Sequence, residues 1–126
     1  MDELFASVEF MKVYALLIET ARRCGLTTYR EIAGVTGWKG QGSYFASRVG
    51  QLLFKINAAE HAQGRPMLSA VVLNQKPDKR TAASLAGFFE CAKGLGLSSA
   101  QSKTAQHDFL NEQLHEVYTT WAEKPQ

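Results

Sequence analysis

Thr27-Thr28-Tyr29-Arg30-Glu31-Ile32-Ala33 opens the stretch of sequence that decides the fold, and Tyr44-Phe45-Ala46-Ser47-Arg48-Val49-Gly50-Gln51-Leu52-Leu53 completes it. The glycine-rich segment 37–42 separates the two halves. Two short helices joined by such a turn are the arrangement of a helix-turn-helix unit. The second helix places polar, basic and aromatic side chains on one side, and these types can meet phosphates and base edges. The pattern favours a nucleic-acid-binding module.

Capping residues and apolar spacing support both helices. Thr28 and Glu31 fit a capping box, in which each side chain satisfies a backbone N–H at the start of the first helix. Ser43 is a natural N-cap for the second helix. We expect that helix over residues 43–57, with an extension as far as His61 and an end at the segment 64–66. Its buried positions, at helical spacing, are Phe45, Val49, Leu52, Leu53 and Ile56.

The flanking segments predict a helical domain with a minor β element. A long amphipathic helix is expected over residues 3–24, closed by Gly25. Residues 67–74 are apolar and β-branched at their centre, which predicts a strand, and the basic segment 75–81 would be a hairpin loop or wing. Helical patterns return over 84–94 and 100–122. The fold class predicted is mainly α with a small β element: a winged-helix-like helix-turn-helix core over 10–82, with a C-terminal helical extension over 83–126, in one domain of 126 residues.

The charge of the chain is distributed unevenly. The formal net charge is only +2, which gives no strong overall attraction to DNA. Between positions 22 and 65, however, seven basic residues face only Glu31 and Glu60 as acids. A basic patch would therefore come from this window and not from the total charge.

The remaining composition indicates a cytoplasmic protein. The chain begins Met1-Asp2-Glu3, with acids where a signal peptide needs positive charge, and no apolar run approaches the length of a membrane span. Cys24 and Cys91 lie far apart in apolar, helical contexts, and we expect two buried free thiols.

No catalytic or metal-binding constellation emerges from the spacing, and no cofactor is implied. Glu90 and Cys91 have no histidine near them in sequence to activate a thiol, which favours a buried structural pair. His107, Asn111 and His115 follow one another at four-residue intervals, so the two histidines are about 12 Å apart along the helix axis, too far to share one ion. These three residues are expected on a solvated helix flank.

Residues 10–80 resemble the DNA-binding domain of alkylguanine-DNA alkyltransferases and of the catalytically inactive alkyltransferase-like proteins. The resemblance is carried by Val13-Tyr14, by the segment 27–33, by Ala46-Ser47-Arg48-Val49-Gly50, and by Arg65-Pro66-Met67-Leu68-Ser69-Ala70-Val71-Val72. It implies a winged-helix-like domain that binds the minor groove through its second helix and flips a base. The family's tyrosine would fall on Tyr29.

The chain departs from that family at the active site. The family's segment Pro-Cys-His-Arg-Val would fall on Pro66-Met67-Leu68-Ser69-Ala70, so the nucleophile, its histidine and the arginine are absent. A thioether has no proton to lose and cannot accept an alkyl group as a thiolate does. The base-displacing arginine would fall on Ser47, with Arg48 one residue late and about 100° around the helix.

Two functions are consistent with these features. The first is a non-enzymatic DNA-binding protein that binds duplex DNA with modest affinity through the helix 43–55 and the wing 74–81. The alternative is a protein-interaction module, such as a regulator or inhibitor in a microbial or phage system, with Trp38 and Tyr44 as anchors. Trp38 is flanked by glycines, so it would either stack on a ligand or fold back over the core. The candidate nucleic-acid contacts are Tyr29, Arg30, Trp38, Lys39, Ser43, Tyr44, Ser47, Arg48, Gln51, Lys55, Lys76, Lys79 and Arg80.

Overall fold

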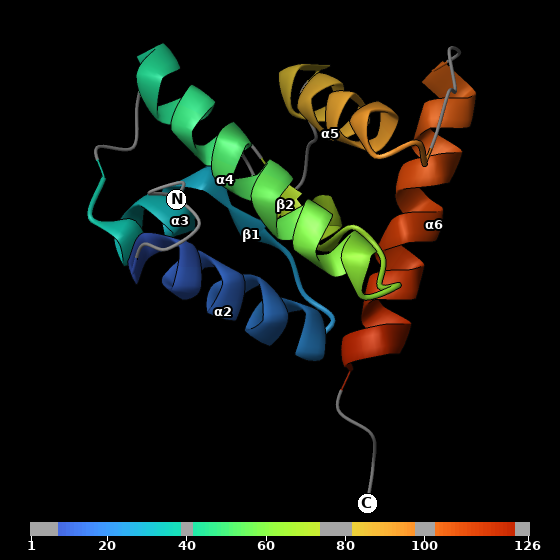
Figure 1. Cartoon of the computed structure of the whole chain (residues 1–126), viewed down its shortest axis with the longest axis horizontal. Helices are drawn as coiled ribbons and strands as arrows, with labels where there is room; N and C mark the ends of the chain where they lie inside the picture. The colour runs from blue at the N-terminus through green and yellow to red at the C-terminus, as the bar shows by residue number, and fades with distance from the viewer. Residues whose placement is uncertain (1–7, 39–41, 74–81, 98–102, 123–126) are drawn as a thin grey trace, which may run out of the picture.

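The computed structural model describes residues 8–38, 42–73, 82–97 and 103–122, and this part of the chain is mainly helical (Figure 1). A very short parallel sheet lies between α2 and α4, and α6 stands beside the C-terminal end of α2 (Figure 1). The predicted fold class is thus confirmed at the level of a helical protein with a small β element. The helices are α2 (Val8–Arg22), α3 (Tyr29–Thr36), α4 (Gly42–Ala62), α5 (Ala82–Gly94) and α6 (Lys103–Trp121).

At the end of α2, the residue in the left-handed conformation is not the one that was predicted. Cys24, and not Gly25, has a positive φ of 53°. The Gly25 N–H donates to the Thr20 carbonyl and the Cys24 N–H donates to the Ala21 carbonyl, both at 3.0 Å. This is the pair of bonds of a Schellman motif, which requires the left-handed residue one position before Gly25. The Tyr118 hydroxyl donates to the Gly25 carbonyl at 2.6 Å and joins α6 to this turn.

The start of α3 confirms one half of the predicted capping box. Thr28 is the N-cap, and its hydroxyl accepts a hydrogen bond of 3.2 Å from the Glu31 N–H. The Glu31 carboxylate accepts from the Thr27 hydroxyl, where the capping box would pair it with the N-cap backbone. The helix ends at Gly37, whose φ of 77° lets its N–H reach back to the Ala33 carbonyl. The predicted break therefore begins at Gly37, and α4 already begins at its last residue, Gly42.

The predicted helix 43–57 is confirmed, and α4 extends beyond it at both ends. Its five predicted apolar residues, Phe45 to Ile56, are all buried. The prediction of Ser43 as N-cap is wrong, because the helix begins at Gly42 and includes Ser43 in its first turn. Gly64, with φ of 74°, ends the helix through bonds from Gly64 and Arg65 to the His61 and Glu60 carbonyls.

The predicted strand over 67–74 is wrong for most of its length. Leu68–Val71 form a 3₁₀ helix, η1, and only Val72–Leu73 form a strand, β2. Its partner is not a hairpin neighbour but β1 (Thr27–Thr28), which pairs in parallel with Thr27 opposite Val72. A short apolar run does not distinguish a strand from a buried helical turn, and residues 68–71 form the buried turn. The predicted wing, 74–81, lies outside the described residues.

Because η1 is buried in the centre of the domain, its backbone N–H groups need acceptors there. All four of its residues are buried, and α2, α4 and α6 all contact it. The Ser69 N–H donates to Asn57 Oδ1 of α4 at 3.1 Å. The Met67 N–H, just before η1, donates to Gln113 Oε1 of α6 at 2.9 Å. Two buried amide side chains therefore accept backbone hydrogen bonds that a neighbouring strand would accept in a sheet.

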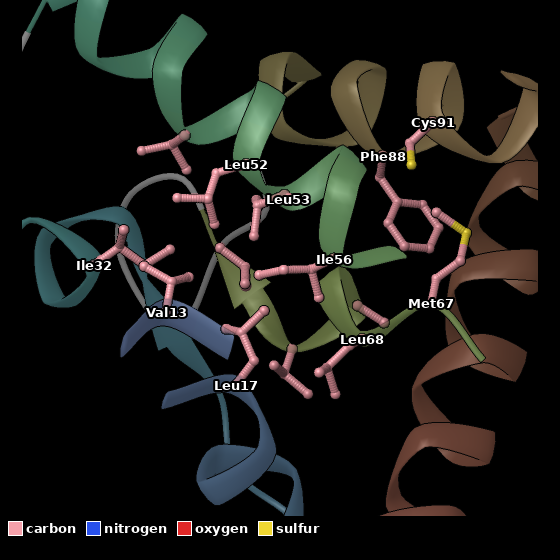
Figure 2. Packing of buried hydrophobic residues seen from close by; sticks show 14 of the residues in the cluster. Val13, Leu17, Ile32, Leu52, Leu53, Ile56, Met67, Leu68, Phe88 and Cys91 are labelled. Carbon is pink, nitrogen blue, oxygen red and sulfur yellow. The ribbon is translucent and has the colours of Figure 1, made fainter. Parts of the chain in front are cut away.

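The apolar core surrounds η1, and Figure 2 shows it from close by. Val13 and Leu17 of α2 point toward Leu52 and Ile56 of α4, and Leu68 lies below Ile56 in the same cluster (Figure 2). Met67, only 1% exposed, points toward Phe88 and Cys91 of α5 (Figure 2). The core therefore extends without interruption from the first half of the chain into the C-terminal helices. On α6, Leu110 and Val117 are fully buried, and Leu114, Tyr118 and Trp121 pack beside them.

A buried carboxylate joins the end of α4 to α2. Glu60 is 0% exposed, and its Oε2 accepts from the Tyr14 hydroxyl at 2.7 Å. Arg65 forms an ion pair with the same oxygen, with Nη2 at 2.6 Å and Nε at 2.8 Å. Arg65 also lies over the Trp121 ring, 5.4 Å from its centroid. Burial and the hydrogen bond to Glu60 raise the pKa of Tyr14 to about 12.

We expect Gln113→Met to lower the free energy of unfolding by about 1–3 kcal/mol, because it keeps the side-chain volume but leaves the buried Met67 N–H without an acceptor. The control is Asn111→Ala on the same helix, where the side chain is exposed; this change should cost less than about 0.5 kcal/mol. Urea denaturation measures both. Equal effects of the two variants would contradict the role assigned to Gln113.

The raised pKa of Tyr14 predicts a specific loss of stability in alkali. The folded protein holds the phenol proton more tightly than the unfolded chain, whose tyrosines titrate near pH 10. The resulting stabilisation is fully present below about pH 10 and is lost as the pH rises toward about 12. The unfolding free energies of the parent and Tyr14→Phe should therefore differ by a constant amount below this window and converge within it. A difference that does not change with pH would show that the phenol proton is not held by the fold.

Candidate nucleic-acid interface

The candidate residues of α4 lie on the side of the helix that faces away from the core. The apolar positions of α4 are packed against α2, η1 and α5, so Ser47 and Gln51 in its first half face solvent, whereas Asn57 and Glu60 further along are buried. Tyr44 is 75% exposed, and Ser47 and Gln51 are also exposed. Arg48 and Lys55 are half-buried. Figure 1 shows that the N-terminal part of α4 projects beyond the neighbouring helices.

Two of the candidates, Trp38 and Tyr44, lie near a third, Arg48. The Arg48 guanidinium carbon lies 4.0 Å from the centroid of the Trp38 ring and 5.9 Å from that of the Tyr44 ring. Both distances are within the range of cation–π attraction. We call these three residues the Arg48 cluster. It joins the turn after α3 to the first half of α4, although its members are up to ten positions apart.

The end of α3 places Trp38 in this cluster. The Thr36 hydroxyl donates to the Ile32 carbonyl at 2.9 Å. The Thr36 hydroxyl oxygen also accepts a hydrogen bond of 3.2 Å from the Trp38 N–H. Gly37, in the left-handed conformation, reverses the chain between them. Trp38 is half-buried and packs against the core, as the alternative of a covering side chain predicted. The Arg48 guanidinium also covers the Trp38 ring, and this contact was not predicted from the sequence.

Tyr29 and Arg30 differ from each other in their environment. The Tyr29 ring packs edge-on against Phe45, with centroids 6.1 Å apart, and burial raises the pKa of its hydroxyl. Tyr29 therefore serves mainly to pack α3 on α4. Arg30 is exposed on the first turn of α3. Five candidates lie outside the residues whose side chains the structure describes: Lys39, Ser43, Lys76, Lys79 and Arg80.

The basic excess of residues 22–65 is smaller at the surface than in the sequence. Arg65 is bound to the buried Glu60, so this pair contributes no net charge to an interface. Arg23 lies 3.8 Å from Glu19 at the C-terminal end of α2. Of the other basic residues in this window, Arg48 and Lys55 are half-buried on α4 and Arg30 is exposed on α3.

The two cysteines differ, and the prediction that both are buried is wrong for Cys24. Cys24 is exposed because the Schellman turn carries it beyond the end of α2. Cys91 is buried, accepts a hydrogen bond of 3.3 Å from Asn57 Nδ2, and has its pKa raised by burial. Its neighbour Glu90 is exposed, so the predicted buried pair does not exist. A buried thiol with a raised pKa is a poor nucleophile.

Met67, where the resembling family has its cysteine, is enclosed in the core. His107, Asn111 and His115 lie on the exposed flank of α6, as predicted. Among the described residues, no group of three or more His, Cys, Asp or Glu side chains could hold a metal ion. No helix in the described ranges is long and apolar enough to cross a membrane.

Sequence reasoning missed the buried polar residues that hold this scaffold together, although a signal was present. Asn57 and Glu60 follow Leu53 and Ile56 by four residues, and Gln113 lies three after Leu110. Polar residues at core-facing positions of a helix require buried partners. The spacing thus marks them as buried, but it does not identify the partners.

Comparison of the chain with protein-family models, with curated proteins and with solved structures gives no match in any of the three.

The environments of the two thiols predict a large difference in reactivity. In the native protein at neutral pH, Cys24 should react with a disulfide reagent such as Ellman's reagent within the time expected of an accessible thiol. Cys91 should react only on unfolding, since burial restricts access and raises its pKa. The release of one equivalent of chromophore from the native protein, and of a second in denaturant, would confirm this. Cys24→Ser should abolish the native phase and leave the second.

Proposed function

We propose that this chain is a DNA-binding protein without enzymatic activity, and that it binds duplex DNA through the exposed face of α4. The observation that carries the proposal is the Arg48 cluster, a guanidinium held on aromatic rings at a solvent-facing side of a helix. Exposed Ser47 and Gln51 extend the same face with hydrogen-bonding groups. Side chains of these types supply the phosphate and base-edge contacts of protein–DNA interfaces.

The sequence resemblance of residues 10–80 to a DNA-binding domain supports the same proposal. In a winged-helix arrangement, α3 and α4 would be the helix-turn-helix pair, and the basic segment 74–81 would be the wing. The absence of a thiol at Met67 and the burial of Cys91 argue against alkyl transfer. The proposed role is therefore binding alone.

A protein partner is the second candidate function. The observation that favours it is the 75% exposure of Tyr44, because tyrosine and tryptophan are typical anchors of protein interfaces. The small net charge of +2 favours it as well. In this case Trp38 and Tyr44 would fill pockets of the partner.

Titration of a labelled duplex at several salt concentrations tests the proposal. We expect affinity in the micromolar range or weaker at physiological salt, because few basic residues serve the face. Arg48→Ala and Lys55→Ala should each weaken binding and reduce the log–log salt slope by about 0.9. Arg23→Ala, at the far end of α2, is the matched control and should change neither quantity.

Absence of binding to any DNA at about 50 mM salt would contradict the proposal, because electrostatic binding is strongest at low salt. That outcome would favour the protein partner. A pull-down in which Tyr44→Ala loses what the parent chain captures would then be the next measurement.

A further inference from the structure

We infer that Trp38 is a positioning residue for Arg48, and that the Arg48 cluster recognises a backbone phosphate of duplex DNA and not an unstacked base. The inference rests on the proposed function and specifies which part of the nucleic acid the cluster contacts. It follows from how the Trp38 ring is covered, from the donors that Arg48 leaves free, and from the bonds that hold Trp38 in place.

The Trp38 ring is not available as a stacking platform. A base stacks on an aromatic side chain only where a ring face is open to solvent. Trp38 is half-buried and packs against the core, and the Arg48 guanidinium carbon lies 4.0 Å from its ring centroid. A base could stack there only by displacing Arg48. Tyr44, although 75% exposed, is also within 5.9 Å of the guanidinium.

Arg48 retains its hydrogen-bond donors while its planar face is occupied. A guanidinium carries five N–H groups that lie in its plane, so stacking on a ring leaves them free for a planar, bidentate acceptor. Among the described residues, no carboxylate forms an ion pair with Arg48, in contrast to Arg65 and Arg23. A phosphate provides the acceptor geometry and charge that this arrangement lacks.

The rings also reduce the conformational freedom that Arg48 must lose on binding. An exposed arginine samples many rotamers, and fixing one of them opposes association. In this chain Trp38, itself held by the Thr36 hydroxyl and Gly37, keeps the guanidinium at one place beside α4. Trp38 therefore contributes to affinity through Arg48 and makes no contact of its own with the ligand.

A double-mutant cycle with Trp38→Leu and Arg48→Ala tests this coupling in duplex titrations. We expect Trp38→Leu to weaken binding about threefold or more, as is usual for coupled neighbours, and to have no further effect once Arg48 is alanine. Arg48→Ala should reduce the salt slope by about 0.9, whereas Trp38→Leu should leave it unchanged, because no charge is removed. Trp38→Phe, which keeps an aromatic ring, should restore part of the affinity and controls for lost packing. Thermal melts establish that each variant is folded.

Base stacking predicts different results. If the ring stacks on bases, the two single losses would be additive, and single-stranded DNA would bind at least as tightly as the duplex. The fluorescence of Trp38, isolated in a Trp121→Phe background, would also be quenched by single-stranded DNA. Any of these results in a parent chain that binds DNA would overturn the inference alone. A parent chain that binds no DNA at about 50 mM salt would overturn the proposed function, and the inference with it.

Discussion

The buried backbone of η1 is the constraint on which the rest of the structure depends. Leu68–Val71 pass through the centre of the domain as a buried 3₁₀ helix, and within the described ranges no strand pairs with these four residues. Beside the turn's own bond from the Ala70 N–H to the Met67 carbonyl, Asn57 of α4 accepts from the Ser69 N–H, and Gln113 of α6 accepts from the Met67 N–H just before η1. An unpaired buried N–H costs about 1–3 kcal/mol, so the two helices must keep one register against η1. The apolar packing of Figure 2 is built around this register.

The register of α4 in turn determines what faces solvent. With Val49, Leu52 and Ile56 fully buried, the opposite side of the helix must carry Ser47 and Gln51 outward. The same constraint places Arg48 at the boundary between core and solvent, where Trp38 can lie against it. A half-buried position suits arginine, because its stem packs on apolar surface while its charged end remains accessible. The candidate interface is thus a consequence of how the core is packed.

The buried Glu60 shows that Arg65, one of the basic residues of the window 22–65, stabilises the fold. A fully buried carboxylate is tolerated because Tyr14 and Arg65 bond to the same oxygen. Its second oxygen, Oε1, and the Trp121 Nε1 are buried without a partner among the described residues, which is the situation in which proteins commonly hold an internal water. Arg65 connects the two groups by pairing with Glu60 and lying over Trp121. A charge count along the sequence assigns Arg65 to a binding surface, but the structure assigns it to this junction.

The sequence by itself determined the helices, their buried sides, and the breaks at Gly37 and Gly64, because periodicity and caps depend on residues within one or two turns. It did not determine that residues 68–71 form a 3₁₀ turn, that β1 pairs with β2, or that Cys24 is exposed. The partners of Asn57, Glu60 and Gln113 also remained open, as did the stacking of Arg48 on Trp38. Each of these depends on contacts between separate elements or on the closing bonds of a turn, whereas local spacing describes a single element. Tertiary structure therefore decided which polar residues hold the core and which remain available to a ligand.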